Sequence, residues 1–381
     1  MSDHDEVVRA LLAARVPESF ATLHAYAPDP APVAVRLDAN EAPALLPTLR
    51  SEERLVLQQA LSAVEPARYP DVRAGRLRGA IAQQLAVGED QLCIGCGSDE
   101  VIAILLSTLG RPVHGAAPRV LVPSPTFVMY RVSARVHGYE VVEVPLDPAC
   151  DLDEPAMLAA LQRTRPAVLF LASPNNPTSS AFDRAKVERL VRAAAQLDPP
   201  TLVVVDEAYL PFRLGDGDPW HGATGLDLLA AHGNVAVLRT LSKIGLAALR
   251  VGWLVGAPAL VAQMEKARLP YDLPTYSQAV AEASFGALAP AIARHVGAIV
   301  DERRRVVGRL NALGGVSFPR PDANFVWLGV SRPAADVAAA MKRSGVLVRS
   351  FPAVADRLRI TVGTPAEDDR MLEALVAALR G

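Results

Sequence analysis

Short runs of hydrophobic residues alternate with amphipathic stretches through the middle of the chain. The runs are three or four residues long and rich in valine and leucine, which is typical of strands covered on both faces. Helical periodicity separates most of them, as in a mostly parallel α/β sheet. Strands are predicted at residues 120–122, 141–144, 168–171, 202–205, 235–238 and 253–255.

The segment before these strands begins with a short helical pattern within residues 1–49. A proline-rich arm at 27–32 follows, which suits an extended segment lying over another surface. Helices are predicted at 51–64, at 75–86 and, after a glycine-bearing loop at 95–98, from Asp99 onward.

The pattern breaks at residues 269–274, where two prolines occur. A long helix is predicted from about 277 to 313, and then short strands at 325–328, 346–348 and 358–361. This pattern predicts a smaller C-terminal α/β domain. We therefore expect an N-terminal arm (1–49) that joins the small domain, a large domain (50–270) and a small domain (271–381).

Composition narrows the class of protein. With 51% hydrophobic and 21% charged residues, the 381-residue chain has the balance of a compact globular protein. A net charge of −2 gives no electrostatic argument for nucleic acid or an anionic membrane as a partner. No apolar run approaches the roughly 20 residues that span a bilayer. The polar, acidic N-terminus and only three cysteines lead us to expect a cytoplasmic protein.

Cys93 and Cys96 have the C-x-x-C spacing of some zinc and redox sites. A second cysteine pair and clustered histidines, which a zinc site would need, are both missing from the sequence. We therefore interpret the two cysteines as small residues packed in a strand and turn, and we predict no metal.

Lys243 follows the predicted strand 235–238, within the sequence Thr-Leu-Ser-Lys at 240–243. A lysine at a strand end beside small residues is partly withdrawn from water, and its neutral amine can then attack a carbonyl carbon to form a Schiff base. Taken alone, the segment more often describes a solvated surface lysine. The other strand ends decide between the two interpretations.

Ligands of open α/β sheets bind beyond the carboxyl ends of the strands, and unusual polar residues gather there in this sequence. The turn at 95–100 opens an apolar helix with Ser98, so it suits either a phosphate or an ordinary helix cap. After strand 168–171, two prolines bracket Asn175 and Asn176 and fix a side-chain amide as a hydrogen-bond donor.

Strand 202–205 delivers Asp206 at its end, with Tyr209 three residues later. A carboxylate there can keep a heterocyclic nitrogen protonated. The alternative is a metal-binding acid of a nucleotide hydrolase, but the sequence contains no phosphate-binding G-x-x-x-x-G-K-[ST] motif. Arg349 and Arg359 belong to small-domain strands, and their guanidinium groups match a carboxylate or phosphate.

Together and in chain order, these motifs resemble the pyridoxal phosphate-dependent aminotransferases of the aspartate aminotransferase fold, over about residues 35–365. Within that superfamily the details look most like the histidinol-phosphate aminotransferases. The motifs concerned are RLDANEAP at 36–43, RYP at 68–70, PTF at 125–127 with Tyr130, LRTLSK at 238–243 and LRITVGT at 358–364. The resemblance implies a large domain with a mostly parallel seven-stranded sheet covered by helices, plus a smaller C-terminal α/β domain.

The resemblance also implies roles for individual residues. Lys243 would form the Schiff base, Asp206 would pair with the pyridine nitrogen, and Tyr209 with Asn176 would bond the ring's phenolic oxygen. The expected cofactor-binding residues are Ser98, Asp99, Glu100, Phe127, Asn176, Asp206, Tyr209, Ser242, Lys243, Arg250 and, from the neighbouring subunit of a homodimer, Tyr69. The expected substrate-binding residues are Tyr26, Asn40, Arg349 and Arg359.

The sequence departs from the family pattern at three places. Phe127 stands where tyrosine is frequent, which keeps ring stacking and loses a hydroxyl. Ser179 stands where a glycine commonly ends the asparagine-proline loop. Lys243 and Arg250 are seven residues apart, where many relatives have eight.

The resemblance therefore predicts a transaminase that moves an amino group between L-histidinol phosphate and 2-oxoglutarate. Lys243 would act as the base for the proton shift. An aromatic amino acid aminotransferase or a threonine-phosphate decarboxylase shares the cofactor residues and stays an alternative. A non-catalytic regulator of the same fold is a remote one, because residues 1–34 are too short for a DNA-binding domain.

Overall fold

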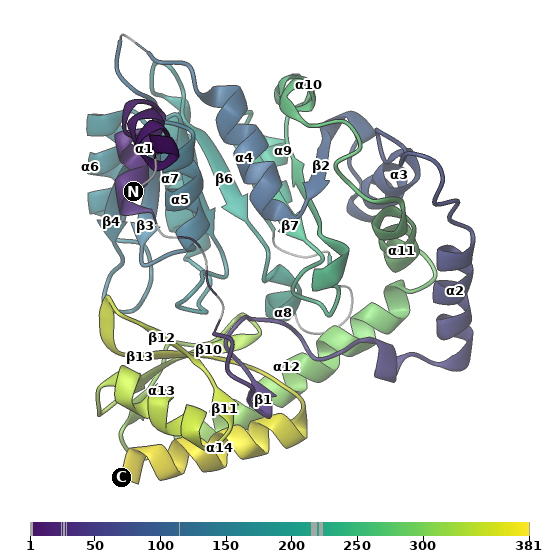
Figure 1. The fold of residues 1–381 in the computed structure, drawn as a ribbon, viewed down its shortest axis with the longest axis vertical. Helices are drawn as coiled ribbons and strands as arrows, with labels where there is room; N and C mark the ends of the chain where they lie inside the picture. The colour runs from purple at the N-terminus through teal and green to yellow at the C-terminus, as the bar shows by residue number, and fades with distance from the viewer. Residues whose placement is uncertain are drawn as a thin grey trace.

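The computed structural model describes residues 3–23, 25, 27, 29–113, 115–214, 219–220 and 224–380. Its largest element is a seven-stranded sheet with the order β2-β8-β7-β6-β5-β3-β4 (Figure 1). Among the described strands of this sheet, β8 alone runs against its neighbours. The predicted mostly parallel sheet is thereby confirmed. Its strands are β2 (Leu92–Cys96), β3 (Arg119–Ser124), β4 (Glu140–Pro145), β5 (Val168–Ala172), β6 (Leu202–Asp206), β7 (Val235–Thr240) and β8 (Val251–Val255).

Helices cover both faces of this sheet, which explains why its inner strands consist mostly of hydrophobic residues, whereas the edge strand β4 contains Glu140 and Glu143. Along β5, Leu169 and Leu171 enter one hydrophobic core, while Val168 and Phe170 enter the core on the opposite face. Helices α4, α5 and α10 cover the second face, and α3, α6, α7 and α9 cover the first. The helices around the sheet are α2 (Ser51–Ser62), α3 (Gly75–Leu85), α4 (Ser98–Leu109), α5 (Val128–Val136), α6 (Glu154–Thr164), α7 (Arg184–Ala195), α8 (Leu210–Leu214), α9 (Gly225–Ala231) and α10 (Pro258–Ala267).

The C-terminal part contains an antiparallel sheet with the order β12-β13-β10-β9. Helices α13 (Ala334–Arg343) and α14 (Pro365–Arg380) pack on it and complete a separate hydrophobic core. Near the other end of the chain, β1 (Val35–Arg36) pairs in parallel with β11 (Val346–Leu347), so the N-terminal arm lies beside the C-terminal part (Figure 1). The strands of the antiparallel sheet are β9 (Val316–Ser317), β10 (Phe325–Val330), β12 (Arg349–Phe351) and β13 (Val354–Thr361).

The single long helix predicted at 277–313 is wrong. The structure has two helices, α11 (Thr275–Phe285) and α12 (Ala289–Asn311), which meet at an angle of 80°. Gly286 ends α11 outside helical geometry, with φ −105° and ψ −114°. A proline in the first turn of α12 is tolerated there because that turn needs no backbone donor. The apolar positions simply continue across the bend.

Helix α12 belongs to two hydrophobic cores. Its N-terminal half places Ile292, Val296 and Ile299 in the core of the large sheet. Its C-terminal half places Val306 and Leu310 in the core of the antiparallel sheet. The helix therefore connects the two sheets physically (Figure 1).

The turn predicted at 95–98 starts later than expected, because Gly95 and Cys96 belong to β2. Glycine fits there since a Cβ on Gly95 would lie 2.9 Å from the Glu100 carboxylate. In the described part of the chain, no single helix is long and apolar enough to cross a membrane. The bent pair α11–α12 passes that test only when its two helices are joined. Helix α1 (Asp3–Arg15) is exposed on the surface.

Candidate active site

A cleft with about 490 Å³ of empty space lies at the carboxyl ends of the parallel strands. Ends of β3, β5, β6 and β7, together with the first turn of α4, supply most of its walls. This is where open α/β sheets bind their ligands. The lining residues are Ser98, Asp99, Phe127, Tyr130, Ala172, Asn176, Asp206, Ala208, Tyr209, Ser242, Lys243 and Arg250. Nine of these were predicted from the sequence as site residues; Tyr130, Ala172 and Ala208 were not.

Asp206 ends β6 with its carboxylate fully inside the protein. Tyr130 donates a hydrogen bond to Oδ2 at 2.5 Å, and the backbone N–H of Ala208 donates to Oδ1 at 2.9 Å. Burial raises the pKa of Asp206 to about 6, although both hydrogen bonds and the charge of Lys243 oppose that rise. A cation beside the carboxylate would offset the remaining desolvation cost.

The phenol oxygen of Tyr209 is the meeting point of two side-chain amides. Asn40 Nδ2 donates to it at 2.9 Å and Asn176 Nδ2 at 3.5 Å. Asn40 reaches the site from the N-terminal arm and has left-handed backbone geometry, with φ 55°. Asn176 and Tyr209 are therefore neighbours in the cleft, and their predicted bonds to a single ligand atom stay a prediction.

Lys243 lies in the turn after β7 and is half-buried. Leu241 and Ile244, both fully buried, anchor the turn on either side of it. Thr240 fixes the turn from within: its hydroxyl donates to the Val251 carbonyl at 3.0 Å and accepts from the Ser242 backbone N–H at 3.1 Å. The amine of Lys243 consequently lies 5.9 Å from the centre of the Tyr209 ring.

The first turn of α4 lines the cleft beside Ser242 and Arg250. Gly97 adopts φ 83°, and a Cβ there would collide with the guanidinium of Arg250. A Cβ on Gly252 would likewise collide with the backbone of Ser98. Arg250 Nη1 donates to Ser242 Oγ at 3.5 Å, so guanidinium, hydroxyl and helix N-terminus face one space. These groups are the ones that hold a phosphate.

Arg359 lies at the rim of the site, on β13. Its Nη1 donates to Asn176 Oδ1 at 2.8 Å and its Nη2 donates to the carbonyl of Asp38. Arg349 is its partner across the β12–β13 pair, so the two side chains share one face of the sheet. The strand register therefore brings together the two arginines proposed from the sequence.

Two predicted site residues lie away from this cleft, and a third is not among the described residues. The side chain of Glu100 turns away from the cleft and accepts a hydrogen bond from the Cys96 backbone N–H at 2.5 Å. Tyr69 is 81% exposed and stacks on Tyr271, with ring centres 4.7 Å apart. Tyr26 lies outside the described residues.

Tyr130 is the contributor to the site that sequence reasoning missed. The PTF motif at 125–127 with Tyr130 indicates the family but does not by itself assign Tyr130 a role. Its spacing carried the signal, because a residue three positions after Phe127 at the start of α5 points to the same side. The two rings meet edge to face at 5.5 Å.

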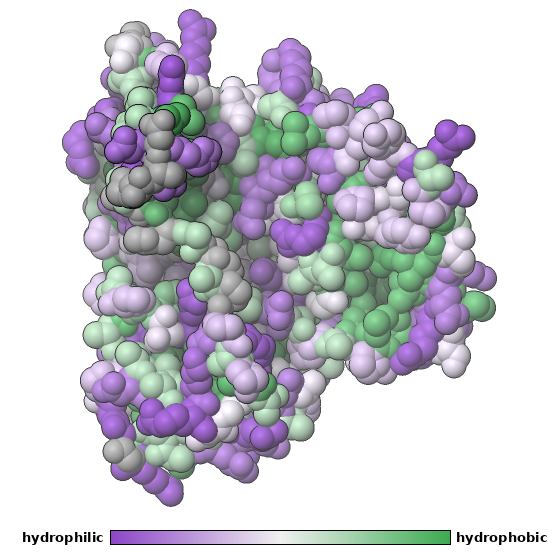
Figure 2. Space-filling view, in the orientation of Figure 1, coloured by the Kyte–Doolittle hydropathy of each residue, from purple (hydrophilic) through white to green (hydrophobic). Residues whose placement is uncertain are grey.

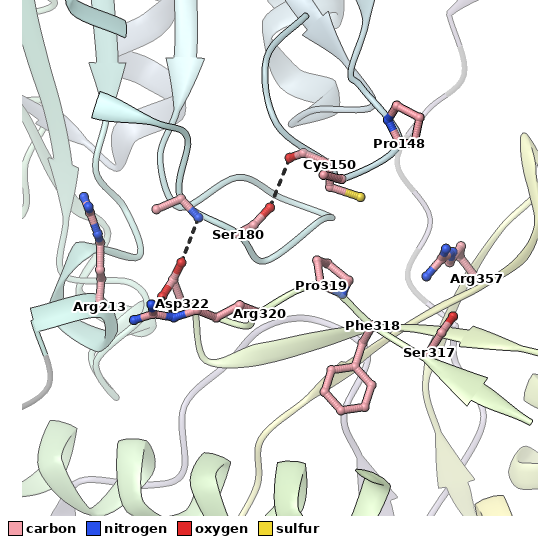
Figure 3. Close-up of a pocket in the computed structure, with 12 residues that line it drawn as sticks. Pro148, Cys150, Ser180, Arg213, Ser317, Phe318, Pro319, Arg320, Asp322 and Arg357 are labelled. Atoms are coloured by element: carbon pink, nitrogen blue, oxygen red, sulfur yellow. Dashed lines mark hydrogen bonds and ion pairs between the residues drawn. The ribbon is translucent and has the colours of Figure 1, made fainter. Parts of the chain in front are cut away.

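Two further observations concern other sites. The described residues contain no group of three or more His, Cys, Asp or Glu side chains able to hold a metal ion, and all three cysteines are free. A second cleft has about 1130 Å³ of empty space (Figure 3). Two loops, which carry Cys150 and Ser180, form one side of it, and the segment from Pro319 to Asp322 forms the other. Its lining contains none of the predicted site residues.

Comparison with known proteins identifies the family. The family described as aminotransferase class I and II matches residues 34–375, and the chain belongs to it. The chain is 40% identical to the histidinol-phosphate aminotransferase of Methylibium petroleiphilum, over 97% of this chain and 95% of that one. The resemblance stated from the sequence is confirmed.

Solved structures show the same fold. The histidinol-phosphate aminotransferase of Sinorhizobium meliloti, solved in complex with pyridoxal-5'-phosphate, has a TM-score of 0.80 and 24% identity, covering 96% of this chain and 98% of that one. The L-threonine-O-3-phosphate decarboxylase of Porphyromonas gingivalis has a TM-score of 0.73 and 19% identity, covering 91% and 100%. The fold is therefore shared by enzymes with different substrates.

Proposed function

We propose that this protein is a pyridoxal phosphate-dependent transaminase. It converts L-histidinol phosphate and 2-oxoglutarate to imidazole-acetol phosphate and L-glutamate, a step of histidine biosynthesis. The observation that carries the proposal is the convergence of a buried acid, a half-buried lysine and the N-terminus of a helix in one cleft, around Asp206, Lys243 and Ser98. The full-length similarity to the Methylibium petroleiphilum enzyme supports the substrate.

The residues of the cleft fit the cofactor. A protonated pyridine nitrogen would be the cation that buried Asp206 favours. Phe127 would cover the ring, and Tyr209 with Asn176 would bond its phenolic oxygen. The backbone at Ser98 and Asp99, with Ser242 and Arg250, would hold the phosphate. When bound, the cofactor supplies the electron sink that makes loss of the substrate's Cα proton feasible.

Lys243 is the residue proposed to hold the cofactor covalently and to move the proton. Its amine lies 5.9 Å from the centre of the Tyr209 ring, and its turn is anchored by buried neighbours. A fixed backbone keeps the amine within reach of one substrate atom, which is what a general base requires.

Arg359 and Arg349 are proposed to bind the anionic end of each substrate, with Asn40 and Tyr26 assisting. Both substrates carry such an end: a carboxylate in 2-oxoglutarate and a phosphate in histidinol phosphate. The guanidinium fork matches either group. One rim site can therefore serve both halves of the reaction.

A homodimer is proposed from an exposed apolar surface beside α2 and α11, visible at the right of Figure 2. Leu55 of α2, Tyr276 of α11, and Leu269 and Tyr271 shortly before α11 are between 46% and 69% exposed. Tyr69 belongs to the same surface and is proposed to reach the cofactor phosphate of the second subunit. Mixing Lys243→Ala with Tyr69→Ala protein tests this: hybrid dimers should recover activity, while two strictly separate subunits would recover none.

The division into an arm (1–49), a large domain (50–270) and a small domain (271–381) stays a proposal. Phe285 and Ile292 lie in the core of the large sheet, which favours a boundary inside α12. We also propose a cytoplasmic location, without nucleic-acid or membrane partners.

An absorbance spectrum of the purified protein with pyridoxal phosphate tests the function. We expect a visible band that shifts on adding glutamate and is lost in Lys243→Ala. Lys266→Ala is the matched control, because its amine bonds Gln263 on the surface. A colourless protein would refute the cofactor, and faster turnover of phenylalanine or threonine phosphate than of histidinol phosphate would refute the substrate.

A further inference from the structure

Ser179 has an unusual conformation for a residue other than glycine. It lies in the loop after β5 with φ 67°, in the left-handed region, and it is completely buried. A side chain in that region costs conformational energy that glycine avoids. Contacts with the surrounding structure must therefore offset this cost.

The hydroxyl of Ser179 joins two distant segments. It donates to the carbonyl of Phe325 at 2.6 Å and accepts from the backbone N–H of Ala323 at 3.4 Å. The carbonyl of Ser179 also accepts from the backbone N–H of Asp322 at 2.9 Å. We call these three hydrogen bonds the serine contact.

A fourth hydrogen bond reinforces the serine contact from outside. Asp322 Oδ2 accepts from the backbone N–H of Ala181 at 3.0 Å, on the wall of the second cleft (Figure 3). The neighbouring Ser180 is different, because its hydroxyl donates to the carbonyl of Cys150 at 3.2 Å. Only the first of these two serines therefore reaches the segment that leads into β10.

Each of the two segments that the serine contact joins carries a residue in or beside the candidate active site. The loop of Ser179 carries Asn176, and Phe325 begins β10. The Phe325 ring lies edge to face with Tyr209, at 5.0 Å between centres, and the guanidinium carbon of Arg359 lies 5.7 Å from its centre. Holding Phe325 in place consequently holds Arg359 at a set distance from Tyr209.

We propose that Ser179 is a positioning residue for anionic substrates. Its hydroxyl fixes Phe325, and the Phe325 ring in turn fixes Arg359 against Asn176 and Tyr209. This inference rests on the proposed function, because it assigns Arg359 to the substrate anion. Glycine at this position would relieve the backbone strain, but it would remove the hydroxyl that fixes the position of Phe325.

The test compares three variants of the holoenzyme. Ser179→Ala removes the hydroxyl and keeps a Cβ atom on a backbone in the left-handed region. Ser179→Gly removes the hydroxyl and relieves the backbone, so it folds without strain. Ser180→Ala is the matched control. The measurements are KM and kcat with 2-oxoglutarate, and the Kd of glutarate, a dicarboxylate that cannot react, by calorimetry.

Both Ser179 variants should raise KM and the Kd of glutarate by about two- to tenfold, the effect of one lost hydrogen bond, with a smaller change in kcat. Ser180→Ala should leave both values unchanged. Wild-type glutarate affinity in Ser179→Gly, or in both variants, would overturn the proposal. Failure of the proposed function would look different, since the visible band of the cofactor would then be missing in the unmodified protein.

Discussion

Tyr130 donates its hydroxyl hydrogen to Oδ2 of Asp206 across 2.5 Å, deep inside the protein. The tyrosine is itself fully buried, and its ring stacks on Phe170 with centres 4.6 Å apart. Burial, strengthened by the neighbouring charge of Asp206, raises the pKa of Tyr130 well above its usual range. The phenol therefore keeps its proton and always acts as donor, which stabilises the ionised form of Asp206.

Replacing this donor should weaken the cofactor site. In Tyr130→Phe, the pKa of Asp206 should rise above its present value of about 6, because the hydrogen bond now lowers it. A carboxyl that stays protonated to higher pH cannot pair with a cationic ring nitrogen. We expect cofactor affinity to fall about tenfold near pH 6.

Titrating the apo-protein with pyridoxal phosphate from pH 5 to 8, followed by absorbance, measures this change against wild type. Tyr139→Phe is the control, because Tyr139 gives an equally buried hydrogen bond to the Leu106 carbonyl. Equal affinities in all three proteins would show that the Tyr130 hydroxyl has no influence on Asp206.

The ion pair of Glu207 and Arg239 should be important for stability. Glu207 Oε2 accepts from Arg239 Nη2 at 2.8 Å, and both side chains are at most 3% exposed. Glu207→Gln leaves a buried guanidinium without its counter-charge, which costs about 3–5 kcal/mol. Urea unfolding of the variant gives the change in the free energy of unfolding.

The exposed pair of Glu188 and Arg192 provides the comparison. Glu188→Gln should reduce the free energy of unfolding by at most about 0.5 kcal/mol, as is usual for exposed helix pairs. If the two variants lose the same amount, burial does not determine the strength of the Glu207 pair.

Asp368 should make the protein less stable at alkaline pH. Burial raises its pKa from 3.8 to about 8, with Glu302 as a further cause. The folded protein thus holds a proton that the unfolded chain has released, so the free energy of unfolding falls as pH rises from about 4 to about 8. Asn in Asp368→Asn cannot ionise and can still accept from Gly363.

Melting temperatures at pH 5 and pH 8.5 test this effect. The melting temperature of Asp368→Asn should rise relative to that of the wild type as the pH rises. The difference between the two melting temperatures should therefore be more in favour of the variant at pH 8.5 than at pH 5. A constant difference at the two pH values would contradict the raised pKa.

Most strands of the large sheet could be predicted because a buried strand is a local run of apolar residues, although β2 (Leu92–Cys96) was not among the predicted strands. Residues 168–171 and 202–205 were correct to within one residue of β5 and β6, since runs of valine and leucine need no information from the rest of the chain. The bend at Gly286 was missed for the same reason. Apolar periodicity continues through the break, and only packing in three dimensions shows that the helix axis turns.

The candidate site was predictable where it depends on strand ends. Asp206 is the last residue of β6 and Lys243 lies three residues after β7, so the adjacency of these two strands in the sheet brings both residues to one cleft. The contacts of Tyr130 and Ser179 span 76 and 146 positions of sequence. Spacing carries no information about such pairs. Glu100 was misplaced because a helix start predicts backbone direction and says nothing about where a long side chain turns.

Helix α12 couples the unfolding of the two hydrophobic cores. Ile292 is buried in one core and Leu310 in the other. If either core unfolds, helix α12 loses the packing partners of that half of its length. The two parts of the chain should therefore unfold together in a single cooperative transition, and neither should survive as a free fragment.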